Sequence, residues 1–231
     1  MDAQTVESVA LSSSANRAVS SDVPRFRGVS HLLAFIAAAP LGVVLVLHAK
    51  TGAAQVSAIV FAASVTAMLA VSSLFHRRSW APARKRWIAL LDHAMIYALI
   101  AGTYTPFCLL VLHAGWRVPI LAIVWGGALV GTVMRLVLPN ASPWLGAGTG
   151  LALGWIAVIV WPQIVGGIGF GASLLLLAGG LAYTFGAVVY ARRRPDPFPH
   201  AFGYHEVFHA LTVVAVSCQY ATVAFFVLPR A

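Results

Sequence analysis

The chain has 231 residues, of which 60% are hydrophobic and only 9% are charged. Soluble domains carry about 25% charged residues, so this composition argues against a soluble enzyme and predicts one compact membrane bundle. Lys and Arg outnumber Asp and Glu by 15 to 6, but they lie between apolar runs, where membrane topology and anionic lipid headgroups explain them better than nucleic acid does.

Residues 1–24 are polar and Ser-rich, without the basic start and apolar core of a secretory signal peptide. We expect this segment to be a disordered tail and residues 25–231 to form one transmembrane domain.

Seven apolar runs follow the tail, each near the ~20 residues that a helix needs to cross a bilayer. They are too long for strands and their apolar residues do not alternate, which predicts an all-α, polytopic bundle of seven transmembrane helices. The expected spans are 28–48, 53–76, 87–112, 117–138, 143–162, 168–191 and 204–228.

The basic residues orient this bundle. If the N-terminus lies in the cytoplasm, 12 Lys and Arg residues fall on the inner side and 3 on the outer side. The positive-inside rule therefore predicts a cytoplasmic N-terminus and a C-terminus outside. Cys108 and Cys218 both fall inside apolar runs, and we interpret them as small buried hydrophobic residues.

Several ionisable residues fall where lipid would make them costly. His76 closes the second run, Asp92 opens the third, and His205, Glu206 and His209 open the seventh. The predicted orientation puts all of them at the cytoplasmic end. Each alone has an ordinary explanation, such as an interfacial position, a helix N-terminal carboxylate or an interhelical hydrogen bond. Their common depth favours a shared site.

The spacing of these residues suits a metal ion. His205 and His209 are four apart on one helix face and can share one ion. With His76 they make three imidazoles, a set that zinc commonly uses while keeping a fourth position for water. Asp92 could serve that water as general base. Ser72 shares the face of His76 and could bind the water or a developing oxyanion, or could simply be a small residue at a helix contact.

The remaining histidines are weaker candidates. His93 points about 100° away from Asp92 around its helix and is a poorer ligand. We expect four others to be structural or solvated: His31, His48, His113 and His200.

Glu206 also completes the His-Glu-x-x-His pattern of zinc proteases, in which it would be the base. Nothing with ligand chemistry follows His209 apart from Cys218. We therefore expect Glu206 to support the site or to pair with a basic residue of the inner segments.

Three stretches resemble the hemolysin III family, which belongs with the progestin and adipoQ receptors, including the adiponectin receptors. They are Ser72–Arg77, Leu91 through Pro106, and Pro199 through His209. The shared motifs are Ser-x-x-x-His on the second span, Asp on the third and His-x-x-x-His on the seventh. The resemblance covers roughly residues 25–228, and the short loops look like the bacterial branch, which implies a bacterial inner membrane.

The resemblance implies a seven-helix bundle with an intracellular N-terminus. It further implies Zn²⁺ held by His76, His205 and His209, with Asp92 and Ser72 near the zinc water. Relatives in the wider superfamily are linked to hydrolysis of lipid amides, ceramide especially. Bacterial members carry a hemolysin label and a link to membrane homeostasis.

The leading hypothesis is therefore a zinc-dependent hydrolase of a lipid amide, with Asp92 and Ser72 as catalytic residues. The alternative is a non-enzymatic sensor or regulator of membrane lipid state with structural zinc. A pore-forming hemolysin and an intramembrane zinc protease are lesser alternatives. In each case we expect membrane lipid as the main partner and no nucleic acid.

Overall fold

The structure, a computed structural model, describes residues 24–230. The predicted tail at residues 1–24 lies outside the described residues apart from Pro24. Seven helical segments are long and apolar enough to cross a membrane, and residues 24–230 contain no strand, as the sequence predicts. The first four are α2 (Val29–His48), α3 (Gly52–Arg77), α4 (Pro82–Leu110) and α5 (Ala114–Val137). The fifth combines α6 (Pro143–Gly154), η1 (Trp155–Val160) and α7 (Trp161–Ile168), the sixth is α8 (Phe170–Arg192), and the seventh joins α9 (Tyr204–Thr222) to η2 (Val223–Val227) and η3 (Leu228–Arg230).

Lipid explains why these runs are helical. A bilayer core offers no water to backbone amides, so each span must satisfy its own hydrogen bonds, as a helix does. The side chains on the outside of the bundle are correspondingly apolar. Leu47 is 77% exposed and Phe225 is 68% exposed, which would be costly in water but suits a surface that faces lipid.

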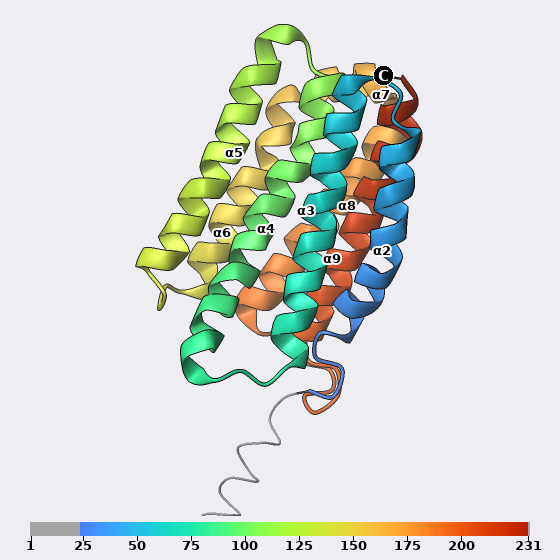
Figure 1. Ribbon diagram of the computed structural model, residues 1–231. Helices are drawn as coiled ribbons and strands as arrows, with labels where there is room; N and C mark the ends of the chain where they lie inside the picture. Colours follow the sequence, from blue (N-terminus) through green and yellow to red (C-terminus); the bar gives the residue numbers. More distant parts are fainter. Residues whose placement is uncertain (1–23, 231) are drawn as a thin grey trace, which may run out of the picture.

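The helices form an up-and-down bundle (Figure 1), in which α2, α3, α4 and α5 pack in chain order and α8 packs on α9. Helix α9 also contacts α2, which brings the last span against the first. Close packing depends on small residues: a Cβ atom at Gly102 of α4 would lie 2.1 Å from the Ser64 hydroxyl of α3. Residues 24 and 230 lie at opposite ends of the bundle, as an odd number of spans requires.

The fifth span is interrupted by η1, a 3₁₀ segment between α6 and α7. The Tyr104 hydroxyl of α4 compensates for the irregular backbone, because it accepts from the Ala157 amide at 2.7 Å and donates to the Gly154 carbonyl at 2.5 Å. With α7 included, this span runs to Ile168, beyond the predicted residue 162. Gly169, with φ of 86°, then turns the chain into α8 in a conformation that favours glycine.

The segment before α2 is bonded to the loop before α9. The Arg25 amide donates to the His200 carbonyl at 3.0 Å, and the Phe26 amide donates to the Ala201 carbonyl at 3.1 Å. The Arg27 side chain forms an ion pair with Glu206 of α9. These contacts hold the first turns of α2 against the first turns of α9, where the predicted site lies.

Candidate metal centre

The last turn of α3 and the first turns of α9 bring His76, His205 and His209 together, and we call these residues the three-histidine cluster. Each offers one nitrogen, and the three nitrogens lie within 4.8 Å of one another. The ring centroids are 4.7 Å apart for His76 and His205, 5.0 Å for His76 and His209, and 4.6 Å for His205 and His209. His209 is only 2% exposed. The structure thus brings together the three residues that the sequence grouped, while their role as metal ligands stays a prediction.

The hydrogen bonding of the cluster is compatible with a bound metal ion. His76 Nε2 and His209 Nδ1 are buried and have no hydrogen-bond partner among residues 24–230. Buried polar atoms without partners are uncommon, because each one gives up its hydration. A shared ion would satisfy both atoms. Tetrahedral zinc holds nitrogens at about 2.0–2.1 Å, so the three donors would need to approach to roughly 3.4 Å from one another.

Asp92 and Ser72 lie beside the cluster. Asp92 Oδ2, from the third turn of α4, is 3.8 Å from His76 Nε2, which is too long for a hydrogen bond but places the carboxylate next to the cluster. Ser72 is buried one turn before His76, and its hydroxyl lies 2.9 Å from His31 Nδ1. The structure thus places both residues where the sequence predicted, while their roles stay predictions.

Both oxygens of the Glu206 carboxylate already have partners. Glu206 is 1% exposed, its carboxylate pairs with Arg27, and its other oxygen accepts from the Gly203 amide at 2.8 Å. The carboxylate therefore caps α9 and ties it to the chain before α2. The prediction that Glu206 pairs with a basic residue is confirmed, and this geometry argues against the protease alternative.

The sequence pattern predicts that His31 is structural or solvated and does not indicate that it lies against the cluster. His31 is 2% exposed, and its ring stacks on His209 with centroids 3.9 Å apart and planes 9° from parallel. A signal was present, because the predicted topology puts the start of the first span at the same depth as His76. His93 and His48, by contrast, bond carbonyls of their own helices, Ala89 at 2.6 Å and Val44 at 2.8 Å.

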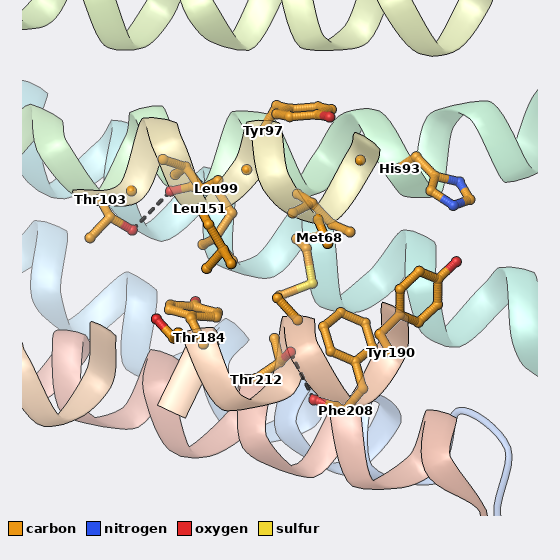
Figure 2. A pocket seen from close by; sticks show the side chains of 18 of the residues that line it. Met68, His93, Tyr97, Leu99, Thr103, Leu151, Thr184, Tyr190, Phe208 and Thr212 are labelled. Carbon is orange, nitrogen blue, oxygen red and sulfur yellow. Dashed lines mark hydrogen bonds between the residues drawn. The ribbon is translucent and has the colours of Figure 1, made fainter. Parts of the chain in front are cut away.

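A cavity of about 1140 Å³ adjoins the cluster. Its lining begins at Arg27, His76 and Asp92 and reaches Leu112 and Trp161 toward the other end of the bundle. Figure 2 shows side chains of α3, α4, α6, α8 and α9 around this space. Most of the lining is apolar, and the volume exceeds the roughly 300–1,000 Å³ of ordinary ligand pockets. A long apolar molecule with a polar end fits this shape.

Comparison with known proteins finds matches over most of the chain. The family described as "Haemolysin-III related" matches residues 20–220. The chain belongs to the hemolysin III family. It is 31% identical over 209 residues to "Hemolysin-3" of Bacillus cereus, covering 88% of this chain and 91% of that protein. It is also 31% identical over 202 residues to "Hemolysin-3 homolog" of Bacillus subtilis (strain 168), covering 86% and 91%.

Membership of the hemolysin III family and seven apolar helices together define an integral bacterial membrane protein. In this hemolysin III protein, the Ser-x-x-x-His, Asp and His-x-x-x-His residues of α3, α4 and α9 lie in one place. Three of them could hold a metal ion.

Proposed function

We propose that this hemolysin III protein is a metal-dependent hydrolase of a lipid amide, with Zn²⁺ held by His76, His205 and His209. The observation that carries the proposal is the position of the three-histidine cluster. It lies at one end of a long apolar cavity, beside a carboxylate and a hydroxyl.

The cavity supports a lipid as substrate. Apolar walls would take the acyl chain, and the polar end of the cavity would take the amide group. Met68, Leu99 and Phe208 line the wall between the two ends (Figure 2). Because this space is long and mostly apolar, a headgroup alone or a soluble peptide would fill it poorly.

Each group at the cluster would have its own role in the hydrolysis. Zn²⁺ bound there would supply Lewis acidity and an activated water. Asp92 would accept a proton as the water oxygen bonds to the carbonyl carbon, and would then pass that proton to the nitrogen as the C–N bond breaks. Ser72 would donate a hydrogen bond to the carbonyl oxygen as negative charge develops on it. The products are a carboxylic acid and an amine.

The charge distribution supports a cytoplasmic position for this site. Among the described residues, eleven Lys and Arg lie at the end of the bundle that carries the cluster, and three lie at the other end. By the positive-inside rule, the end with the cluster would face the cytoplasm. The substrate would then come from the inner leaflet.

The test begins with metal analysis of purified protein and continues with Asp92→Asn. This variant keeps the size of the side chain but loses its basicity. We expect it to retain zinc and fold while cleaving an N-acyl lipid such as ceramide roughly 10²–10⁴-fold more slowly than wild type. His48→Gln, at the other end of the bundle and outside the cavity lining, is the control and should keep its rate. Loss of zinc in Asp92→Asn would contradict the assigned role.

One observation favours a second candidate, a regulator of membrane lipid state with structural zinc. Helix α3 packs mainly on α2 and α4, whereas α9 packs mainly on α8. A metal bound by His76 and His209 would join these two parts of the bundle and stabilise their arrangement. If so, wild type should cleave none of the lipids offered, and Asp92→Asn should keep its physiological effect.

A further inference from the structure

His31 makes two contacts with the candidate metal centre, and neither follows from the family motifs. Its ring lies flat on His209, with centroids 3.9 Å apart, and its Nδ1 atom lies 2.9 Å from the Ser72 hydroxyl. It comes from α2, which contributes none of the other residues discussed above for the site. Its other nitrogen, Nε2, is buried and has no hydrogen-bond partner in the described part of the chain.

These features differ from those of an ordinary core histidine, which would bond both nitrogens when buried. If packing were the only requirement, an apolar ring would fill the space without leaving Nε2 unpaired. The imidazole is therefore explained by what it touches. Those neighbours are His209, a member of the three-histidine cluster, and Ser72, the hydroxyl beside it.

The hydrogen bond to Ser72 has a preferred direction. If the Ser72 hydroxyl donated to Nδ1, then Nε2 would carry the ring proton, and among residues 24–230 this buried donor has no acceptor within hydrogen-bond distance. If Nδ1–H donates instead, Nε2 is only an unpaired acceptor, and orphaned acceptors are better tolerated than orphaned donors. This second arrangement leaves the Ser72 proton free to point toward the cavity that Ser72 lines.

The stacking of the His31 ring constrains its other neighbour, His209. A parallel ring in close contact restricts rotation of the His209 imidazole and keeps water from its face. A cation bound to His209 would withdraw electron density from its ring, and the π face of the His31 ring would then stabilise it. An oriented ligand ring binds metal more tightly, because less freedom is lost on binding.

We propose that His31 is a positioning residue of the metal centre, which fixes the His209 ring by stacking and directs the Ser72 hydroxyl proton into the cavity. This inference rests on the proposed metal centre. It extends the site to a residue from the first transmembrane helix.

Substitutions at one position separate the two contacts. His31→Phe keeps a ring against His209 but cannot donate to Ser72, His31→Asn keeps an N–H donor but loses the ring, and His31→Ala loses both. His48→Ala is the matched control, because His48 lies at the opposite end of the same helix and bonds the Val44 carbonyl of that helix. Thermal unfolding of the metal-free proteins checks that each variant folds.

Co²⁺ serves as a spectroscopic probe of the centre in detergent-solubilised protein. We expect His31→Ala to bind Co²⁺ about 10- to 100-fold more weakly than wild type, the range for losing a group that orients a ligand. Its visible absorption bands should shift. His31→Phe should restore most of the affinity and the spectrum, while His48→Ala should match wild type.

A long-chain fatty hydroxamate, which binds metals through oxygen, tests the contact with Ser72. His31→Phe and Ser72→Ala should weaken its binding to the Co²⁺ protein by similar factors. The double variant should be no weaker than either single one, since both changes remove the same interaction. Independent, additive losses would overturn the role in directing Ser72.

The outcomes separate this inference from the function on which it rests. If wild type binds neither Zn²⁺ nor Co²⁺, the metal centre itself is wrong. If wild type binds Co²⁺ and folded His31→Ala binds it equally well with the same spectrum, only the positioning role of His31 is wrong. Should His31→Ala fail to fold, His31→Phe and His31→Asn decide the question in the same assays.

Discussion

Removing the Arg27 side chain should destabilise the bundle by about 3 kcal/mol, because it leaves the Glu206 carboxylate buried without its cation. The Glu206 side chain is 2% exposed and that of Arg27 is 21% exposed. Loss of one partner from a buried ion pair costs about 3–5 kcal/mol. The lower end applies here because the Arg27 side is partly open to water and Glu206 keeps the Gly203 amide.

The assay is thermal unfolding of metal-free protein in detergent. By the relation for soluble domains of similar length, about 3 kcal/mol corresponds to a fall of roughly 6–12 °C in the unfolding midpoint. Arg25→Ala is the matched control, since Arg25 is exposed and its bond to the His200 carbonyl comes from the backbone amide, which alanine keeps. It should leave the midpoint nearly unchanged.

A double variant tests the physical cause. Arg27→Met with Glu206→Gln removes both charges and should recover most of the stability lost in Arg27→Ala. The reasoning is refuted if Arg27→Ala unfolds at the same temperature as Arg25→Ala, or if the double variant is the least stable protein of the set. A protein in which Glu206→Gln is fully stable but loses peptide cleavage would instead revive the protease alternative.

Three further predictions test the site, the topology and the cavity. His205→Ala should lose bound zinc, measured by elemental analysis, whereas His93→Ala should keep it near stoichiometric; equal zinc in both would remove His205 from the centre. A reporter fused after Arg230 should score as external and one fused at the N-terminus as cytoplasmic, and the reverse result would overturn the orientation. Gly180→Leu should weaken lipid binding, because Gly180 lines the cavity and has free space beside it. Gly171→Leu is the control, because Gly171 has the same free space on the same helix but lies outside the cavity, and it should leave lipid binding unchanged. Equal losses of binding in the two variants would refute the cavity as the lipid site.

The seven spans were predictable because lipid imposes long apolar runs whatever the packing within the bundle. Details that depend on contacts between residues far apart in the sequence were not predictable. Helix α4 begins at Pro82 rather than the predicted residue 87, because proline suits a first helical turn and the basic residues after it are exposed. The 3₁₀ segment η1 is bonded by Tyr104, which lies 50 or more positions earlier in the chain. A local sequence pattern does not indicate such a contact.

For the candidate site too, some residues were predictable from the sequence and others depend on contacts between distant residues. Depth and helical spacing together selected His76, His205 and His209, because a charge count fixed the ends and a four-residue spacing fixed the face. The same reasoning missed His31, because α2 is apolar around most of its circumference and its pattern does not show which face meets α9. Only the three-dimensional contact reveals that His31 lies on His209.

The two contacts between the start of α2 and the start of α9 have a common geometry. Arg27 and His31 are four residues apart, and their partners Glu206 and His209 are three residues apart on α9. Glu206 and His209 lie near one another on one face of α9, while Arg27 lies in the turn before α2 and His31 in the first turn of α2, so two neighbouring groups on one segment meet two neighbouring groups on the other. The ion pair sets the height of α2 against α9, and the ring stack is formed at that height. This arrangement explains why a charged residue just outside the first span and a histidine just inside it both belong to the environment of a metal centre whose ligands come from α3 and α9.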